Sequence, residues 1–423
     1  MRVSMSSLVA AFLSAAILAA CSGGNNGLSS STPMSVTPQI AAPLSQSPTG
    51  LRAERAHVRP AYSVLYSFNG GSDGEYPWAG LLNANGTLYG TTASGGSKHK
   101  GTVFKITTSG NETVLYRFMG GAVDGENPYA SLINVKGTFY GTTRRGGGGG
   151  CGHHFCGTVF SITPSGMETV LHSFDGGRGN PDGAFPEASL INVKGTLYGT
   201  TLSAGPEAYG TAFSVTTSGT ETVLHGFSGI GSGDGAFPYA RLLNIKDTLY
   251  GTTREGGATN EGIVFSVTLS GSETVLYNFA GGSDGASPWG GLINVNGTLY
   301  GTTRGGGSGC GGYGCGTVFA ITTSGKEMVL HRFGGSSDGA LPTADLLNIN
   351  GTLYGTTQGG GANNDGTVFS ITTSGTETVL HSFGTGTGDG QNPYAGLINV
   401  NGTLYGTTTS GGSGYGTVFS LSP

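Results

Sequence analysis

The sequence has little charge and no cluster of basic residues. Asp, Glu, Lys and Arg make up 10% of its 423 residues, and the formal net charge is -5. A chain without a basic patch is a poor candidate for binding nucleic acid, and we expect no such partner. Glycine, in contrast, is abundant at 83 residues, and the chain holds 18 Tyr and 19 Phe. A low net charge together with so many aromatic residues argues against an intrinsically disordered protein.

The first 20 residues, MRVSMSSLVAAFLSAAILAA, have the pattern of a signal peptide. Arg2 supplies a positive start, and the apolar run that follows is too short to span a membrane as a helix. The segment Leu18-Ala19-Ala20-Cys21 resembles the lipobox of bacterial lipoproteins. The resemblance implies that Cys21 becomes the first mature residue and carries acyl chains that anchor the protein. The alternative is an ordinary signal peptide followed by a chance cysteine.

The next segment, residues 21–60, is rich in Ser, Pro, Gly and Ala and has no periodic apolar pattern. This composition is typical of a flexible tether. Ser22, by resemblance to enterobacterial lipoprotein sorting, favours the outer membrane. We therefore expect a monomeric cell-envelope protein with a signal peptide at 1–20, a lipidated tether at 21–60 and one folded domain at 61–423.

One phrase, GTLYGTT, recurs through residues 61–423 at intervals of 50 to 58 residues. Its seven copies, two of them with one substitution, begin at Gly86, Gly137, Gly195, Asp247, Gly297, Gly351 and Gly402. Periods of this length are typical of propellers and other repeat architectures.

Each repeat contains four short segments that are rich in β-branched and aromatic residues. In the second repeat we expect strands at Ser131–Val135, Thr138–Thr143, Thr158–Thr163 and Glu168–Phe174. Asn-Gly or Lys-Gly pairs separate the first two segments, as a type I′ hairpin turn requires. T-x-S-G separates the last two and predicts a second tight turn. The fold class that follows is all-β, with seven four-stranded antiparallel blades.

The phrase V-L-[YH]-x-F occurs first at Val64–Phe68, before the first complete repeat, and the chain ends just after a third segment. This offset predicts that the N-terminal strand completes the last blade and closes the ring, which leaves no free edge strand.

The seven-fold repeat resembles the bacterial GloVer tandem repeats over residues 61–423. The resemblance implies display at the cell surface and assigns no catalytic residues, cofactor or metal.

The long connections, from fourth to first and from second to third segment, are expected on one face of the ring, where binding residues usually lie. An Asp and a Pro recur in each fourth-to-first loop, and we interpret the Asp as an Asx turn, with a calcium site as the alternative. The residue after the Pro is aromatic in five repeats, which either surround the channel mouth or pack between blades. These five are Trp78, Tyr129, Tyr239, Trp289 and Tyr394.

Arg241 and Asp345 replace small residues near the predicted channel, and they either line a site or face bulk water. The glutamate of the recurring E-T-V-L phrase is expected to be a solvated cross-strand partner. It stands at positions 112, 168, 221, 273 and 377.

Two cysteine pairs, Cys151 with Cys156 and Cys310 with Cys315, lie in second-to-third loops. Export to an oxidising compartment and the equal spacing predict two local disulfides. The alternative for the first loop is a metal site that adds His153 and His154, which the second loop lacks.

The repeats are so alike that few residues are singular, whereas catalysis needs singular residues in one pocket. We therefore expect a binding or scaffold module for a polysaccharide or an envelope protein, with no cofactor and no catalytic residue. The alternative is a secreted propeller glycosidase or lyase. It would use carboxylates near the channel mouth, and the available ones are Glu75, Glu187, Glu207 and Asp345.

Overall fold

The structure is a computed structural model that describes residues 60–148, 150–151, 155–176, 182–307 and 309–423. The predicted signal peptide, Cys21 and nearly all of the tether lie outside the described residues, as do His153 and His154. No helix in the described part of the chain is long and apolar enough to cross a membrane.

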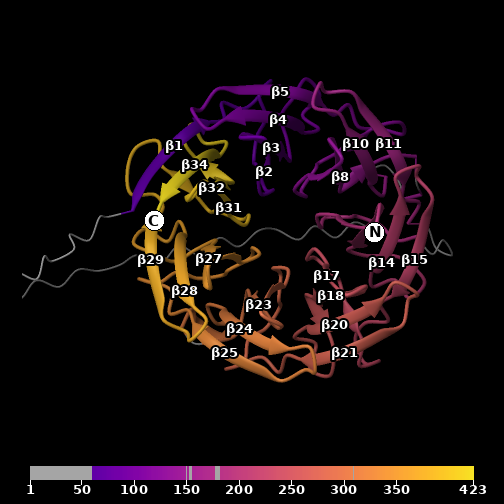
Figure 1. The fold of residues 1–423 in the computed structure, drawn as a ribbon, viewed down its shortest axis with the longest axis vertical. Coiled ribbons are helices and arrows are strands. Elements are labelled where there is room, and N and C mark those ends of the chain that lie inside the picture. The colour runs from indigo at the N-terminus through magenta and orange to yellow at the C-terminus, as the bar shows by residue number, and fades with distance from the viewer. Residues whose placement is uncertain (1–59, 149, 152–154, 177–181, 308) are drawn as a thin grey trace, which may run out of the picture. The chain divides into compact units, whose positions relative to one another are not determined.

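Seven four-stranded antiparallel sheets follow one another around a ring and form a seven-bladed β-propeller (Figure 1). The strands of the first four blades, from the channel outward, are β2 (Leu82–Ala84), β3 (Thr87–Thr92), β4 (Thr102–Thr107), β5 (Glu112–Arg117); β7 (Ile133–Val135), β8 (Thr138–Thr143), β10 (Thr158–Ile162), β11 (Glu168–Ser173); β12 (Ile191–Val193), β13 (Thr196–Thr201), β14 (Thr211–Thr216), β15 (Glu221–Gly226); and β17 (Leu243–Ile245), β18 (Thr248–Thr253), β20 (Ile263–Thr268), β21 (Glu273–Asn278).

The strands of the last three blades, in the same order, are β22 (Ile293–Val295), β23 (Thr298–Thr303), β24 (Thr317–Thr322), β25 (Glu327–Arg332); β26 (Leu347–Ile349), β27 (Thr352–Thr357), β28 (Thr367–Thr372), β29 (Glu377–Ser382); and β31 (Ile398–Val400), β32 (Thr403–Thr408), β34 (Thr417–Ser422), β1 (Ala61–Ser67). Short pairs and one turn of 3-10 helix lie in the loops: β6 (Gly125–Glu126) with β9 (Arg145–Gly146), β16 (Gly235–Ala236) with β19 (Glu255–Gly256), β30 (Gly390–Gln391) with β33 (Ser410–Gly411), and η2 (Gly311–Tyr313).

The predicted hairpins are confirmed, and three strand boundaries in the second blade are wrong: the first strand begins later than predicted, and the third and fourth strands end at Ile162 and Ser173, each one residue early. Asn85 and Gly86 both have positive φ, 54° and 81°, as a type I′ turn requires. The first strand of the second blade begins at Ile133 rather than at Ser131. Ser131 lines the channel, and its backbone N–H donates to the Ser189 hydroxyl of the next blade, so it is not available for pairing within its own sheet.

The predicted closure of the ring is also confirmed. β1 pairs with β34 from Ala61 opposite Ser422 to Ser67 opposite Thr417 (Figure 1). In this way the first and last strands of the described chain share one blade, and the ring has no unpaired seam.

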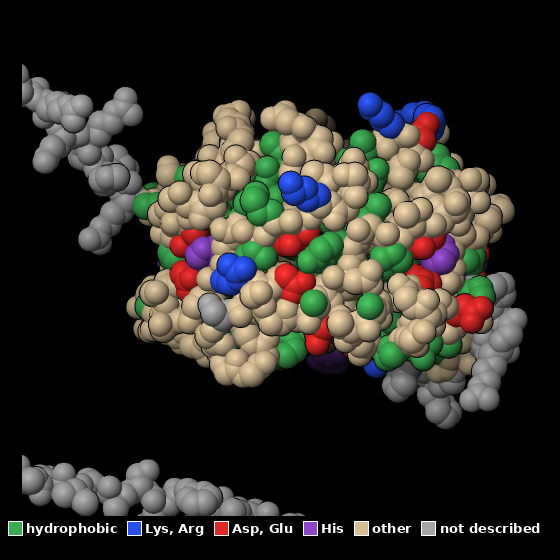
Figure 2. Space-filling model, turned by 90° about the horizontal axis from the view of Figure 1, so that it is seen from below, with side chains coloured by type: hydrophobic (Ala, Val, Ile, Leu, Met, Phe, Trp, Pro, Cys, Tyr) green, Lys and Arg blue, Asp and Glu red, His purple; other side chains and the backbone are tan. Residues whose placement is uncertain are grey.

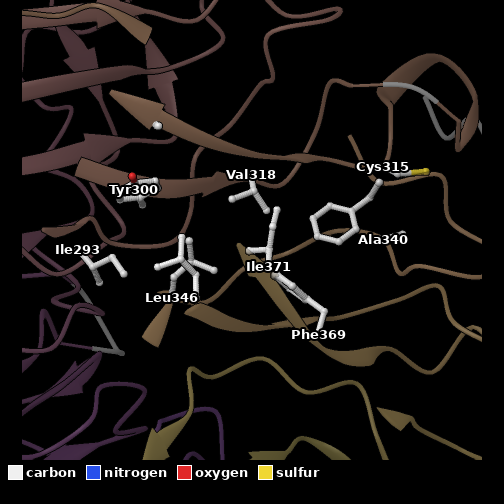
Figure 3. Close-up of a cluster of buried hydrophobic side chains, with 11 residues drawn as sticks. Ile293, Tyr300, Cys315, Val318, Ala340, Leu346, Phe369 and Ile371 are labelled. Atoms are coloured by element: carbon white, nitrogen blue, oxygen red, sulfur yellow. The ribbon is translucent and has the colours of Figure 1, made fainter. Parts of the chain in front are cut away.

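The apolar core lies between neighbouring blades rather than within any one of them. Each interface contains a Phe from the end of a fourth strand that meets the Phe of the next blade's third strand edge to face, as Phe333 meets Phe369 with ring centroids 5.2 Å apart. Figure 3 shows this interface, where Ile293 and Tyr300 of one blade pack near Leu346 of the next. Because each blade depends on both neighbours for its core, we expect the stability of the propeller to depend on closure of the ring.

The last two threonines of GTLYGTT explain why the phrase is repeated. The first donates its hydroxyl to a carbonyl near the channel end of the next blade, as Thr91 does to Ala130 at 3.2 Å. The second contacts a threonine hydroxyl of the adjacent strand, as Thr92 does with Thr102 at 2.8 Å. Each phrase therefore joins its own blade to the following one with buried hydrogen bonds.

Candidate functional site

Seven loops bring seven equivalent residues to one mouth of the central channel. The residue before each Pro has a positive φ between 50° and 59° although none is glycine. Its backbone N–H donates to a carbonyl of the preceding blade, as Phe237 does to Tyr209 at 2.9 Å. The backbone thus turns at the same point in each loop and directs the residue after the Pro towards the channel.

The five aromatic residues singled out in the sequence converge at this mouth. They line a cavity of about 90 Å³, together with Glu187 and Thr343 at the two other equivalent positions. Several rings contact one another: Trp78 lies 4.3 Å from Tyr394 and 5.3 Å from Tyr129, and Trp289 lies 4.7 Å from Tyr239, measured between centroids. They form a half-buried aromatic floor at the mouth, in which rings of neighbouring blades contact one another.

Arg241 and Asp345 line the channel below the aromatic floor and pair with one another there, not with bulk water. The residue between them in the ring, Gly291, donates its N–H to Asp345. A Cβ at Gly291 would lie 2.7 Å from the Asp345 carboxylate and 3.0 Å from the Arg241 side chain. The blade between the pair therefore needs glycine for the side chains to reach across it.

Three arginines that the sequence argument missed surround the aromatic floor. Each directly follows a GTT, at a position that is Ala93, Leu202, Gln358 or Thr409 in the other blades. Arg144 lies over Tyr129 and Phe185, Arg254 over Phe237 and Trp289, and Arg304 over Trp289, with guanidinium-to-centroid distances of 4.8 to 6.0 Å. Their departure from the repeat was the available signal. A guanidinium over an aromatic face is attracted by the ring's quadrupole, which helps to hold these arginines at the mouth.

Glu187 is the most deeply buried carboxyl at the mouth. Burial raises its pKa, which the positive charge of Arg144 at 2.6 Å and hydrogen bonding to Tyr239 oppose. A raised pKa is a property of a general acid, but glycoside hydrolysis needs a second carboxyl about 5–9 Å away. The other carboxylate that lines this cavity, Asp345, is held by Arg241. Both carboxyls are thus engaged by arginines.

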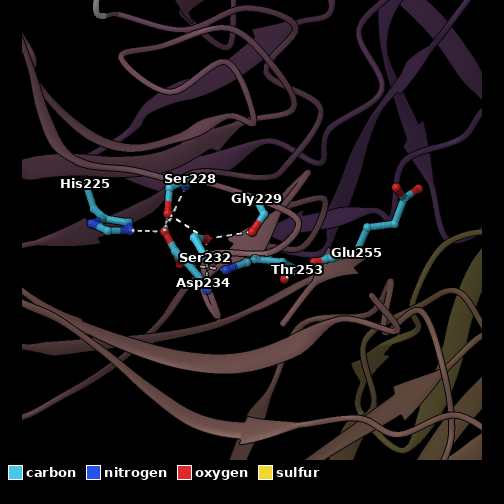
Figure 4. Close-up of polar contacts among 8 residues, drawn as sticks. His225, Ser228, Gly229, Ser232, Asp234, Thr253 and Glu255 are labelled. Carbon is cyan, nitrogen blue, oxygen red and sulfur yellow. Dashed lines mark hydrogen bonds and ion pairs between the residues drawn. The ribbon is translucent and has the colours of Figure 1, made fainter. Parts of the chain in front are cut away.

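The aspartates of the fourth-to-first loops accept hydrogen bonds from groups across their loops, a longer span than an Asx turn covers. Asp234 accepts hydrogen bonds from the Ser228 N–H at 2.8 Å, the Ser228 hydroxyl at 3.1 Å and the Gly235 N–H, and it contacts the His225 ring at 3.1 Å (Figure 4). Equivalent contacts from a Tyr or His and from a backbone N–H occur in the other blades, for example at Asp73 and Asp389. The repeat's own geometry therefore accounts for these residues.

A glutamate of the next blade completes each of six such clusters. These glutamates are half-buried rather than solvated, which corrects the expectation from the E-T-V-L phrase. Burial, with a smaller contribution from the neighbouring aspartate, raises the pKa to about 7 for Glu112, Glu168, Glu221, Glu273, Glu327 and Glu377. Figure 2 shows acidic side chains and histidines gathered in a band at mid-height of the rim.

One cluster, His225 with Asp234 and Glu273, places its ligand atoms within 4.8 Å of one another and could hold a metal ion. Three blades carry Tyr66, Tyr116 or Tyr277 in place of the histidine and make the same contact to aspartate. A neutral phenol is a poor metal ligand, so a bound metal ion would explain only the clusters that contain histidine. A structural role in the loop explains all of them.

The two predicted disulfides are present. Cys151 pairs with Cys156 and Cys310 with Cys315, with Cα–Cα distances of 5.3 and 5.2 Å. Cys156 and Cys315 are buried, and their carbonyls accept the N–H of Phe185 and Leu341 from the next blade. Each disulfide therefore fixes a Gly-rich loop beside the mouth.

The fold and the mouth define a seven-bladed propeller whose long-loop face carries an aromatic floor ringed by arginines. The Gloeobacter/Verrucomicrobia repeat model matches residues 55–246 and 186–419, and the chain belongs to this family. No curated protein matches the sequence.

Several solved structures are similar to the chain at low sequence identity. One is PorZ, described as an essential bacterial surface component of the type-IX secretion system of Porphyromonas gingivalis (15% identity, 84% of this chain and 48% of that chain, TM-score 0.51). Others are puromycin hydrolase (13%, 79% and 50%, TM-score 0.48) and a putative 6-phosphogluconolactonase from Bacteroides uniformis (13%, 72% and 84%, TM-score 0.45). The chain matches about half the length of the first two, and the likeness to PorZ concerns the fold alone.

Proposed function

We propose that this protein is a non-enzymatic binding module of the bacterial cell envelope that recognises a polysaccharide at the aromatic mouth of its long-loop face. The convergence of Trp78, Tyr129, Tyr239, Trp289 and Tyr394 on one half-buried surface carries the proposal. Sugar rings present flat C–H faces that stack on aromatic side chains, and Trp and Tyr dominate binding hot spots.

The shape of the mouth supports an extended ligand rather than a small one. The cavity of about 90 Å³ is far below the size of a drug-like pocket. A polymer lying across the floor could contact several rings at once without entering the channel. Binding would then rest on the summed contacts of a few rigid aromatic residues.

The test compares the wild-type protein with Trp78→Ala and Trp289→Ala on a panel of immobilised polysaccharides. We expect each variant to lose at least about 10-fold in affinity for the polysaccharide that the wild type binds, because each removes a stacking surface. Met328→Ala, which removes an exposed apolar side chain from an outer strand, serves as the control and should bind normally. Wild-type protein that binds no polysaccharide but retains a protein from envelope extract would refute the carbohydrate proposal.

The lipid anchor at Cys21 and the outer-membrane location belong to the same proposal. They rest on the N-terminal sequence pattern, and an anchored propeller could reach a polymer of the envelope on its tether. Cys21→Ser should release the protein from the membrane fraction, and mass spectrometry of the wild-type N-terminus should detect acyl chains. An unmodified N-terminus would contradict the anchor without affecting the binding proposal.

A further inference from the structure

Arg304 differs from the other two arginines at the mouth because no carboxylate pairs with it among the described residues. Arg144 pairs with Glu187 and Arg254 with Glu255, each at 2.6 Å. Among the described residues, Arg304 makes one polar side-chain contact, a long one of 3.5 Å to the side-chain oxygen of Gln358. One of the three cations therefore lacks a counter-charge within the described structure.

Two buried donors near Arg304 also lack acceptors. The Nε of Arg304 and the indole Nε1 of Trp289 are both buried without a hydrogen-bond partner in the described part of the chain. The guanidinium lies 4.8 Å from the centroid of the Trp289 ring, so the two donors belong to one small region. Buried donors without partners are costly in free energy, and two of them close together here indicate an acceptor that comes from outside the chain.

A groove opens beside this region and offers room for such an acceptor. It has a volume of about 460 Å³, far larger than the central cavity. Its polar lining includes Arg304, Gln358, Asn364 and Asn392, and none of the described residues that line it is Asp or Glu. Tyr313, which is 49% exposed, forms one wall from the loop that the Cys310–Cys315 disulfide closes.

We propose that this groove, the Arg304 groove, binds a sugar residue that carries a carboxylate, such as the uronate of an acidic polysaccharide. The inference rests on the proposed function and specifies its ligand. The planar guanidinium of Arg304 matches a carboxylate with two parallel hydrogen bonds. Asn364 Oδ1 already accepts the Gly360 N–H and Asn392 Nδ2 already donates to the Gln358 carbonyl, so Asn364 Nδ2 and Asn392 Oδ1 are left to bond the sugar hydroxyls. The Tyr313 ring supports one face of the sugar. The polymer continues from the groove over Trp289 onto the aromatic floor.

The test measures the affinity of the full chain for polygalacturonate and for its methyl-esterified form, which keeps the backbone but loses the charge. We expect the acid form to bind about 10-fold to 100-fold more tightly, as one charge-assisted hydrogen-bonded pair provides. Arg304→Gln should lower the affinity for the acid form to that for the ester. Arg304→Lys should give an intermediate affinity for the acid form, because lysine keeps the positive charge but cannot make the two parallel hydrogen bonds of a guanidinium.

Two features of the chain supply matched controls. Glutamine already occupies the equivalent position in the next blade as Gln358, so Arg304→Gln suits the repeat and should fold. Lys136→Asn removes the same charge from a hairpin turn, where other repeats carry Asn, and should leave both affinities unchanged. Trp78→Ala, outside the Arg304 groove, should weaken both forms equally.

The outcomes separate the two proposals. Equal affinity for acid and ester, with both lowered by Trp78→Ala, overturns the Arg304 groove and leaves the polysaccharide module standing. A preference for the acid that Arg304→Gln does not reduce also overturns the groove. Binding of neither form, nor of any other polysaccharide, overturns both.

Discussion

The glycine inside GTLYGTT shows how little freedom the repeat allows at a single residue. Gly141 lies under the Phe160 ring, and a Cβ there would approach the ring to 2.7 Å and Leu132 to 2.9 Å. The same contact recurs at Gly90, where the distance to Phe104 would be 2.5 Å. The residue is thus glycine because the aromatic ring needs the space, and not because the backbone needs a positive φ.

Gly141→Ala should destabilise the protein by about 1–3 kcal/mol, because a methyl group forced into a close-packed interface displaces the phenylalanine. Denaturant unfolding followed by fluorescence measures the change. Gly386→Ala, where a Cβ meets nothing within 4 Å, should shift the midpoint far less. Equal shifts for the two variants would contradict the packing explanation.

At the scale of the strand, the outer edges of neighbouring blades are joined by polar clusters. An aspartate from the loop after one blade meets the Tyr or His of that blade's outer strand and the Glu of the next outer strand, as Asp73 does with Tyr66 and Glu112. At the closing blade Tyr62 takes the place of the glutamate and stacks on His381 with centroids 3.7 Å apart. The clusters repeat because the strands repeat.

These clusters predict a dependence of stability on pH. Six glutamates have a pKa raised to about 7 in the folded chain, against an ordinary value of about 4.3 when unfolded. The folded state binds more protons between these values, so stability should fall as pH rises from about 4.5 to 7.5. Below that window the opposite effect begins, because burial is outweighed by hydrogen bonds that lower the pKa of Asp389 to about 2.

Thermal unfolding between pH 5 and pH 8 checks the sign, with the higher Tm expected at pH 5. Replacing all six glutamates with glutamine should flatten the dependence, whereas Glu207→Gln, at an exposed loop position, should leave it unchanged. A Tm that climbs towards pH 8 in the wild type would show that the clusters do not control the pH dependence.

For the whole molecule, we expect stability to depend on the contacts that close the ring. β1 supplies the outer strand of the last blade, and Phe68, just after it, is fully buried against Phe104 of the first blade. Thr407 also donates to the Ala79 carbonyl across the same seam at 2.9 Å. Each interface has an equivalent set of contacts, so the closing interface contributes as much as any other.

A chain that begins at Asn69 should lose more than about 5 kcal/mol of stability, since burying one phenylalanine alone contributes about 3–5 kcal/mol. The loss is comparable with the total stability of a typical domain, so we expect no cooperative unfolding transition by calorimetry. A chain that begins at Pro60 retains β1 and is the control. A truncated chain that unfolds at the same temperature as this control would show that closure is dispensable.

The sequence by itself determined the number of blades, their four strands, the hairpin turns, the closure and both disulfides. Each of these follows from local signals, such as Asn-Gly pairs, alternating strand residues and cysteine spacing, repeated often enough to remove ambiguity. The convergence of the five aromatic residues on the mouth also followed from their equal place in each repeat, although packing between blades remained an alternative.

Only the tertiary structure decided which singular residues meet. Arg241 and Asp345 lie 104 residues apart and pair across the channel, and Arg304 lines one groove with Gln358 and Asn392 from the following blades. The half-buried state of the glutamates likewise arises between blades. A repeat specifies its own strands through neighbouring residues, but contacts between blades depend on the curvature of the ring, which no single repeat encodes.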